Sequence, residues 1–337
     1  MNNKLPLLLA LLVLLLATGC NDNQPLKNAA IVMGTGIDKE EGKKHYTFSM
    51  EIMKISTGGA ASGQSGDHSP KKSVVLHIDA DNLFQGIRES VRYSKRRLFF
   101  THNRVWIISE RAARDNMVKP LDLVMRDQML RLKSFIFVTE NEPEEMLTSP
   151  TLLQGLTSLE LATGTAALRY TGNPGSMNLS EFFESLSGPV QTAYAPMIHL
   201  EQQTEGEVPV ISGAAVIEGE KMVGKLDQRE TFGLFLIRGE VESGWLMTDN
   251  ELAGDRLTME VDRQTSKVKA RLQGDRLTAD IDIRVHGTLS VSPPDFDITQ
   301  PGVKEQVEES MKEHVEQIVG DTLHKLQNEL GADLTNI

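Results

Sequence analysis

The sequence predicts an α+β fold, with antiparallel or mixed β-sheets flanked by helices, several subdomains and a long amphipathic C-terminal helix. Three observations predict this class. Short apolar segments of strand length, several of them alternating, occur in two stretches of the 337 residues. Segments with the apolar spacing of amphipathic helices lie among them. One apolar stripe at helical spacing then extends from Val303 to Leu330. The spacing of the elements does not favour a doubly wound parallel sheet.

Composition and charge narrow the class of protein. Hydrophobic residues make up 39% and charged residues 24% of the chain, a globular balance that excludes wholesale disorder. The 35 Lys and Arg against 47 Asp and Glu give a net charge of -12, which argues against a nucleic-acid binder because such proteins need a basic surface. The single cysteine excludes an intrachain disulfide and a cysteine-based zinc cage.

Residues 1–19 have the pattern of a lipoprotein signal peptide. Lys4 supplies a positive start, and Leu5–Ala17 is an apolar run that is shorter than the roughly 20 residues of a membrane-spanning helix. The small residues Thr18 and Gly19 then precede Cys20, an order that resembles a bacterial lipobox. The resemblance implies cleavage between Gly19 and Cys20, with a diacylglyceryl group on the thiol and an N-acyl chain on the new terminus.

A lipid on Cys20 would tether the mature protein outside the cytoplasmic membrane. Two acyl chains hold a protein firmly where one does not. An ordinary secretory signal or an uncleaved anchor helix are the alternatives, but neither explains a lone cysteine directly after the apolar run. Residues 20–28 predict a polar tether, and the eight residues after the cysteine reach at most about 28 Å.

Residues 29–205 are predicted to form an N-terminal α+β domain. Its first strand is expected at 29–34, with a turn at 35–39 and a return strand at 46–52. The Gly- and Ser-rich segment 57–73 predicts a mobile surface loop. Further strands are expected at 73–78, 98–100, 104–108 and 135–138, and helices near 83–91, 110–126 (interrupted at Pro120), 143–147 and 179–186. For the first of these helices we expect Asp79 or Asp81 as the cap and Leu83, Phe84, Ile87 and Val91 on one face.

Residues 206–337 are predicted to form a C-terminal domain of antiparallel sheet plus the long helix. The polar, irregular stretch 195–209 marks the expected boundary. Strands are expected at 211–217 and 221–224, joined by a turn at Gly219-Glu220, and at 257–261, 268–272 and 277–285. The long helix has the apolar stripe Val303, Val307, Met311, Val315, Ile318, Val319, Leu323, Leu326 and Leu330, and an acidic face expected to be solvated.

The chain carries no recognisable catalytic or metal-binding motif, so we predict no enzyme, no metal and no cofactor other than the lipid. The eight histidines are scattered, and no pair has the helical spacing and intervening glutamate of a zinc protease. Gly34-Thr35-Gly36 lacks the third glycine of a dinucleotide fingerprint and predicts a tight turn. There is neither a P-loop nor a G-x-S-x-G nucleophile elbow.

One basic cluster stands out in this acidic chain: Arg88, Arg92, Lys95, Arg96, Arg97 and Arg104. It indicates a contact with anionic lipid headgroups or with an acidic partner, and Arg92, Lys95, Arg96 and Arg97 are the candidate contact residues. A solvated helix end explains the same cluster without a partner, because cations complement the helix dipole.

Five motifs in order resemble the Ger(x)C family. They are the lipobox, LKNAAIVMGTGIDK at 26–39, SKRRLFFTHNRVWIISE at 94–110, PLDLVMRD at 120–127, and SGAAVIEGEKMVGKL at 212–226 followed by ETFGL at 230–234. The resemblance implies an α+β lipoprotein on the outer face of the spore inner membrane. It also implies a C subunit that assembles with multi-pass A and B subunits into a nutrient germinant receptor.

The family carries no known catalytic residues. Carried over by position, Cys20 is the lipid site, and the other matched residues hold the fold: Gly34, Gly36, Asp38, Leu98, Phe99, His102, Arg126, Asp127, Gly213, Gly224, Leu226, Glu230 and Thr231. Members usually continue for a few tens of residues past the long helix, so the resemblance implies a shortened C-terminal domain. The alternatives are a solute-binding lipoprotein of an ABC transporter, with two lobes and a hinge, and an envelope hydrolase.

Overall fold

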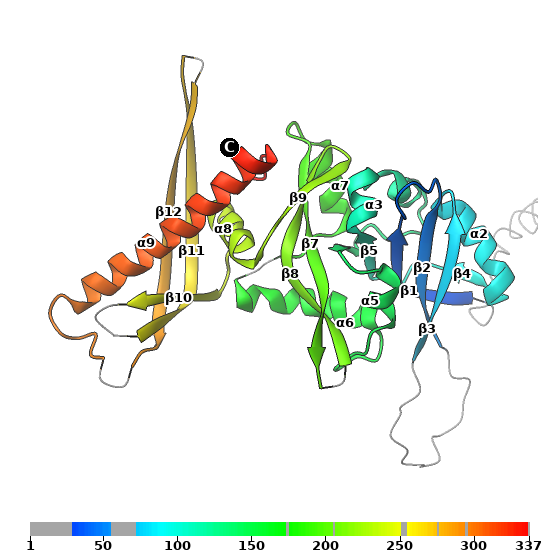
Figure 1. Cartoon of the computed structure of the whole chain (residues 1–337), viewed down its shortest axis with the longest axis horizontal. Coiled ribbons are helices and arrows are strands. Elements are labelled where there is room, and N and C mark those ends of the chain that lie inside the picture. Colours follow the sequence, from blue (N-terminus) through cyan, green and yellow to red (C-terminus); the bar gives the residue numbers. More distant parts are fainter. Residues whose placement is uncertain are drawn as a thin grey trace, which may run out of the picture.

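The computed structural model describes residues 29–54, 72–172, 175–204, 206–250, 255–274, 276–293 and 296–335. The predicted signal peptide, Cys20, the tether and most of the predicted loop at 57–73 lie outside these ranges. The described part forms an elongated α+β molecule, which confirms the predicted fold class. The N-terminal strands lie at one end, and a long hairpin crossed by the last helix lies at the other (Figure 1).

A nine-stranded mixed sheet occupies the N-terminal two-thirds of the molecule. Its order is β3-β2-β1-β5-β6-β7-β8-β9, and β4 pairs with β1. The strands are β1 (Ala29–Asp38), β2 (Tyr46–Met53), β3 (Ser73–Ala80), β4 (Arg97–Phe99), β5 (Val105–Ser109), β6 (Phe135–Thr139), β7 (Thr192–Gln203), β8 (Gly206–Glu218) and β9 (Lys221–Leu226). The outer neighbours pair antiparallel, whereas β1, β5, β6 and β7 pair parallel in the centre. Parallel neighbours need long crossovers, and helices supply them here.

Helices cover both faces of this sheet. They are α2 (Leu83–Ser94), α3 (Glu110–Asn116), η2 (Lys119–Leu121), α4 (Asp122–Arg126), α5 (Pro143–Thr148), α6 (Thr157–Gly164), η3 (Thr165–Thr171), α7 (Leu179–Ser187) and α8 (Gln228–Arg238). Alternate residues of β5 separate the two cores. Trp106 and Ile108 join the cluster that includes α3 and α7, while Val105 and Ile107 pack with α5 and α6. Helices α6 and η3 were not predicted from the sequence pattern.

The predicted turn at 35–39 is wrong, because β1 continues to Asp38. The two glycines serve close packing instead. A Cβ on Gly36 would lie 2.6 Å from Cβ of Pro143, and one on Gly34 would lie 2.7 Å from Cβ of Ser158. Helices α5 and α6 therefore approach the strand so closely that no side chain fits between them.

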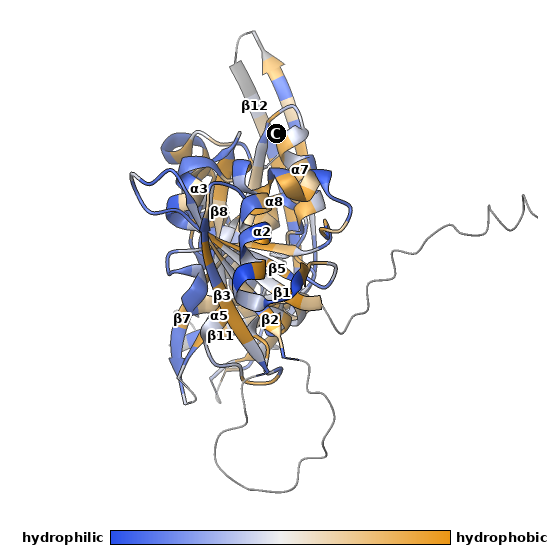
Figure 2. Ribbon diagram, turned by 90° about the vertical axis from the view of Figure 1, so that its right-hand side faces the viewer, coloured by the Kyte–Doolittle hydropathy of each residue, from blue (hydrophilic) through white to orange (hydrophobic). Residues whose placement is uncertain are grey.

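The predicted boundary at 195–209 is a hairpin rather than an irregular segment. Ile198 pairs with Ile211 and Glu201 with Val208 on strands β7 and β8. The division expected between residues 205 and 206 thus falls inside this hairpin, and both predicted halves contribute to one sheet. Backbone hydrogen bonds hold the ladder, so its exposed end tolerates the polar residues that suggested a loop (Figure 2).

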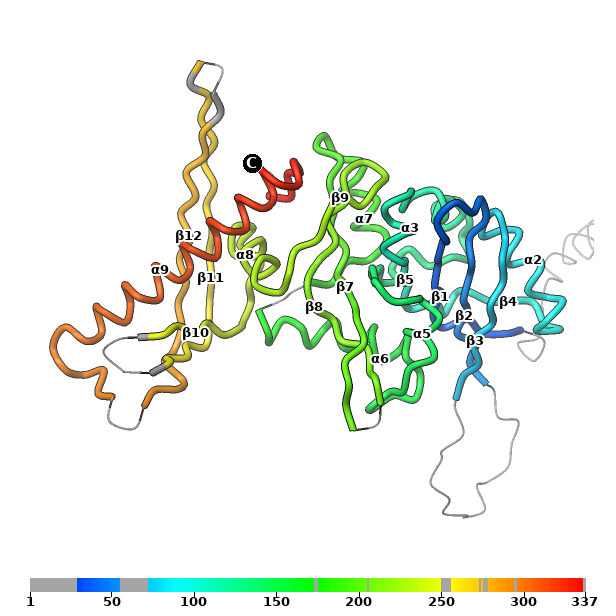
Figure 3. The backbone as a smooth tube through the Cα atoms, viewed as in Figure 1, coloured from blue at the N-terminus to red at the C-terminus, as the bar shows by residue number. Residues whose placement is uncertain are grey.

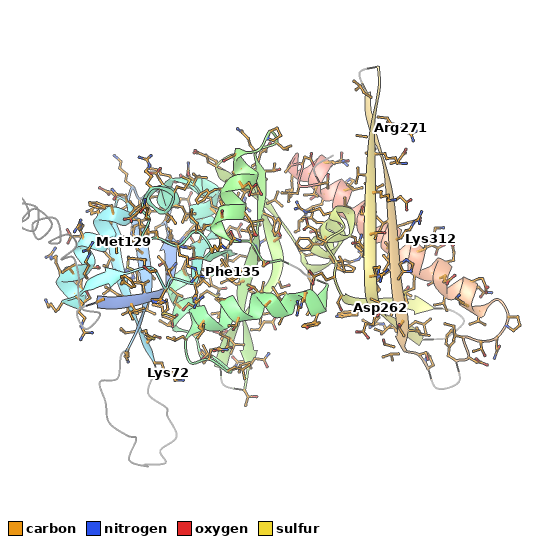
Figure 4. All side chains as sticks on the ribbon, turned by 180° about the vertical axis from the view of Figure 1, so that it is seen from behind. Lys72, Met129, Phe135, Asp262, Arg271 and Lys312 are labelled. Atoms are coloured by element: carbon orange, nitrogen blue, oxygen red, sulfur yellow. The ribbon has the colours of Figure 1, made fainter. Side chains whose placement is uncertain are left out.

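A three-stranded sheet follows, in the order β10-β11-β12. Its strands are β10 (Gly244–Asn250), β11 (Asp255–Gln273) and β12 (Arg276–Val291). The strands predicted at 257–261 and 268–272 are one continuous strand, because the polar residues between them still pair with β12. Within the described ranges, strand β10 pairs only with residues 255–261 of β11. The remainder of β11 and β12 projects as a two-stranded ribbon (Figure 3), with Asp262 near its base and Arg271 near its outer end (Figure 4).

The long C-terminal helix is confirmed. Helix α9 (Val303–His324) continues as a π-helix, η4 (Lys325–Leu330). Val307, Met311, Ile318 and Leu326 of the predicted stripe are buried, and the glutamates of the acidic face are exposed. The helix crosses the three-stranded sheet diagonally and packs on α8 (Figure 1).

Candidate functional site

The described chain begins at an edge where β1 and β4 run side by side. Ala29 pairs with Arg97 and Ala30 with Leu98, in parallel register. Gly19 and Cys20, the predicted cleavage and lipid residues, lie outside the described ranges. Only eight residues separate Cys20 from Ala29, and eight residues span at most about 28 Å even when fully extended.

Helix α2 ends at the same edge. Asn82 caps its start, where the side-chain oxygen accepts a hydrogen bond of 3.0 Å from the amide of Gln85, so the predicted caps Asp79 and Asp81 are wrong. Lys95 ends the helix in the left-handed region, at φ 56°, and its amide donates to the carbonyl of Val91. Strand β4 begins two residues later, which brings the end of α2 next to the start of β1.

The body covers only part of the apolar stripe of α2. Leu83 is buried and Ile87 is half-buried against the core. Phe84 is 53% exposed and Val91 is 42% exposed, so these two residues of the predicted apolar face are not covered by the body. The ring of Phe48 lies against Gly86 instead, which rotates the buried side of the helix away from Phe84.

The four candidate contact residues are all exposed around the end of α2 and the start of β4. Arg92 pairs with Glu89 at 3.0 Å, and Nζ of Lys95 donates to the carbonyl of Arg92 at 2.7 Å. Within the described ranges neither Arg96 nor Arg97 forms an ion pair.

Two other members of the basic cluster differ from these four. The guanidinium of Arg88 lies over the ring of Phe84, 5.0 Å from its centroid. Arg104 does not belong to this group, because it lines a pocket together with Arg131 and Lys133. The structure therefore assembles five of the six predicted cations and excludes Arg104.

At the other end of β1, Asp38 joins the sheet to α3. Nε of Arg111 donates to Oδ1 of Asp38 at 2.6 Å, and the same guanidinium reaches Glu142. Burial alone raises the pKa of Asp38, but hydrogen bonds from Arg111, Ser109 and the Lys39 amide outweigh it, so the pKa lies below its ordinary value. A carboxylate held in this way stabilises the contact between β1 and α3, and it is a poor proton carrier.

Sequence reasoning missed the fully buried carboxylate of Glu51. It caps α6 by accepting hydrogen bonds from the amides of Thr157 and Ser158, at 3.2 and 3.0 Å, and from the Ser158 hydroxyl. The hydroxyl of Ser73 donates to it at 2.9 Å. The only signal in the sequence was an acidic residue inside a strand with buried positions on both sides. Four donors on one carboxylate make it a packing anchor of β2, β3 and α6.

Several residues of the matched motifs join elements of the fold. A Cβ on Gly224 would lie 2.3 Å from a methyl carbon of Leu330, so β9 and η4 are in close contact. Gly213 has φ of +81° and passes close to the carbonyl of Leu226. Glu230 completes a reciprocal capping box with Asp227 at the start of α8.

A pocket of about 880 Å³ lies between α7, β7, the end of α8 and β11. Tyr194, Arg238 and Gln264 line it, together with the carboxylates Glu181, Glu184, Glu240, Glu242 and Asp262. Arg238 is already paired with Glu240 at 2.7 Å, and burial raises the pKa of the Tyr194 phenol well above its ordinary value. Among the residues that the structure describes, the lining includes no histidine or cysteine.

The described ranges contain neither a cluster of metal-ligating side chains nor a membrane-spanning helix. No group of three or more His, Cys, Asp and Glu side chains converges there in a way that could hold a metal ion. No helix in that part of the chain is both long and apolar enough to cross a bilayer.

Residues 22–200 match the family described as "Spore germination protein N-terminal domain", and residues 212–337 match "Spore germination B3/ GerAC like, C-terminal". The chain belongs to the GerAC family of spore germination proteins. The predicted Ger(x)C resemblance is thereby confirmed.

Relatives of this GerAC chain extend over most of its length. It is 21% identical to spore germination protein KC of Bacillus subtilis over 95% of this chain and 82% of the relative. It is 23% identical to spore germination protein YndF of the same organism over 99% of this chain and 87% of the relative. The crystal structure of the GerBC protein superposes with a TM-score of 0.52, at 18% identity, over 90% of this chain and 84% of the other. That likeness shows a shared fold.

Proposed function

We propose that this GerAC chain is the lipid-anchored, non-catalytic C subunit of a nutrient germinant receptor on the outer face of the spore inner membrane. The observation that carries the proposal is the match of the two GerAC families over residues 22–200 and 212–337. The order Thr18-Gly19-Cys20 after an apolar run supports the lipid anchor. The short chain between Cys20 and Ala29 then keeps the body near the membrane surface.

Assembly with multi-pass A and B subunits is the second part of the proposal. The projecting ribbon of β11 and β12 supports it, because an isolated two-stranded ribbon is only marginally stable in water. Beyond Val261 the described ribbon has no third strand, and Val268 and Leu272 are 36% and 73% exposed. Unpaired strand edges that carry apolar side chains are typical of surfaces that pair with another chain.

The titratable side chains of Asp38, Glu51 and Arg238 are already engaged in ion pairs or hydrogen bonds, which supports a non-catalytic role. The carboxylates of Asp38 and Glu51 hold elements of the fold together, and Arg238 in the pocket between α7, β7, α8 and β11 is paired with Glu240. The solute-binding alternative expects two lobes joined by a hinge. Here the β7–β8 hairpin places both predicted halves in one sheet, which favours the receptor subunit.

A germination assay tests the function. Spores that lack the gene should fail to release dipicolinate with at least one nutrient, while a non-nutrient trigger still releases it. The wild-type gene should restore the response, and Cys20→Ala should restore it poorly because the body is no longer held at the membrane. Normal nutrient-triggered germination of the deletion strain, with every nutrient and receptor background tried, would contradict the proposal.

A further inference from the structure

We propose that the outward side of α2 lies on the surface of an anionic lipid bilayer and fixes the orientation of the body on the membrane. This surface, called the α2 face below, consists of Phe84, Arg88, Val91, Arg92, Lys95, Arg96 and Arg97. The inference rests on the lipid-anchored role proposed above and adds which surface touches the membrane.

The first support is the pattern on the helix. Phe84, Arg88, Val91 and Lys95 follow one another at spacings of four, three and four residues, which places them along one side of α2. Phe84 and Val91 are exposed, although they continue the apolar stripe that begins with buried Leu83. Exposed apolar side chains flanked by cations on a helix are typical of helices that lie in a membrane interface.

The second support is charge. Five Arg and Lys but only one carboxylate, Glu89, occur between Leu83 and Arg97, in a chain whose net charge is -12. A bilayer of anionic lipids repels most of this protein and attracts the α2 face, because Arg and Lys gain free energy near such a surface. The exposed guanidinium of Arg88 over the Phe84 ring also joins a cation to an apolar group that can enter the headgroup layer.

The third support is the position of the anchor. Ala29 pairs with Arg97, so the chain that leads back to Cys20 leaves the body beside the cationic end of α2. Its eight residues reach at most about 28 Å. Figure 1 places α2 at the outer end of the molecule, opposite the β11–β12 ribbon. The anchor and the α2 face therefore meet the same surface, which favours a bilayer over an acidic protein as the occupant.

The single native cysteine makes a direct test possible. Cys20 is consumed by lipid in the proposed anchor, so Phe84→Cys in the full acylated chain offers one thiol for an environment-sensitive fluorophore. Tyr170→Cys is the matched control. Tyr170 is 63% exposed, and Arg169 lies over its ring at 5.0 Å, but it belongs to η3, which packs with α6 and β10 and is not part of the α2 face.

Both labelled proteins are placed on vesicles of phosphatidylcholine with and without phosphatidylglycerol. On phosphatidylglycerol vesicles we expect a blue-shifted emission at position 84 and about threefold stronger quenching by a spin-labelled lipid than at position 170. On pure phosphatidylcholine the difference should shrink. The change Arg88→Gln with Lys95→Gln, Arg96→Gln and Arg97→Gln should abolish the difference while the acylated chain still floats with the vesicles.

The other outcomes separate the two proposals. Equal quenching at positions 84 and 170 on phosphatidylglycerol vesicles, with the chain still floating, would overturn the α2 face and leave the lipid anchor intact. Protection of position 84 in spore membranes that contain the other receptor subunits, without protection on vesicles, would also overturn it and would favour a protein partner. An acylated chain that fails to float with any vesicle would instead contradict the anchor of the proposed function.

Discussion

Ala29 and Arg97 pair in parallel register, so the first described residue after the predicted tether lies beside the cationic end of α2. No pattern in the sequence indicates this pairing, because β4 is only three residues long. The pairing brings the proposed lipid anchor to the exposed cations of α2, while the β11–β12 ribbon lies at the opposite end of the molecule (Figure 1). In the account proposed above, the end with α2 meets the membrane and the end with the ribbon remains exposed for partner subunits.

The close packing of β1 predicts a strong effect of Gly36→Ala. Its Cβ would lie 2.6 Å from Cβ of Pro143, so α5 must shift. We expect a loss of about 1–3 kcal/mol in the free energy of unfolding, measured by urea denaturation. Gly164→Ala in α6 is the control, because nothing lies within 4 Å of its Cβ, and alanine there should be neutral or stabilising. Equal stability of the two variants would contradict this packing.

The buried carboxylate predicts that Glu51→Gln destabilises the protein although the side chain keeps its size. The new amide group would face the amides and hydroxyls that donate to Glu51 now, at Thr157, Ser158 and Ser73. The expected cost is about 1–3 kcal/mol in the free energy of unfolding. Glu145→Gln, on the exposed side of α5, should change it little. A Glu51→Gln protein as stable as Glu145→Gln would show that the capping contacts are unimportant.

The Asp38–Arg111 pair predicts a pH dependence. The pKa of Asp38 is lowered in the folded protein, so its contribution is fully present above the unfolded carboxyl pKa, about 3.9, and is lost as the pH falls through the folded pKa. Melting temperatures measured from pH 6 to pH 3 should therefore fall less steeply below about pH 4 for Arg111→Gln than for the wild type. Arg126→Gln, which removes an exposed pair with Asp122, should follow the wild-type slope. Parallel curves for all three proteins would contradict the assignment.

The contact between α8 and α9 predicts that Gly233→Ala loosens the C-terminal helix. A Cβ on Gly233 would lie 2.1 Å from Oγ1 of Thr322, which donates to the carbonyls of Ile318 and Glu230. Amide hydrogen exchange in residues 303–324 should speed up by about tenfold or more, because the two helices must separate. Gly320→Ala, on the open side of α9, should leave the exchange rates unchanged or slower. Unchanged exchange in Gly233→Ala would show that the helices do not need this contact.

Local patterns allowed the strands β2 and β9 and the long helix to be predicted from the sequence. Alternation or a long stripe at helical spacing is visible within one segment, and the stripe of α9 is buried largely as its spacing indicates. The glycines of β1 could not be interpreted in this way. These positions need glycine because Pro143 and Ser158 approach β1 closely, and both belong to helices more than a hundred residues further along the chain.

The candidate surface was predicted only in part. The five cations of the α2 face all lie within residues 88–97, so the cluster was visible in the sequence. The exposure of Phe84 and Val91 was not, because periodicity gives the width of an apolar stripe and not how much of it the body covers. Likewise the β7–β8 hairpin was not visible in residues 199–209, since backbone pairing leaves no compositional signal there. The two family matches nevertheless divide between residues 200 and 212, close to the predicted boundary.

Co-purification from spore inner membranes tests the central claim most directly. Tagged wild type and Cys20→Ala are expressed at equal levels, and the membranes are solubilised in mild detergent. The account predicts that the wild type brings down two multi-pass membrane proteins, and that Cys20→Ala leaves the membrane fraction and recovers less of both. Recovery of a transporter permease instead, or of no partner from a wild type that remains on the membrane, would contradict the assignment as a receptor subunit.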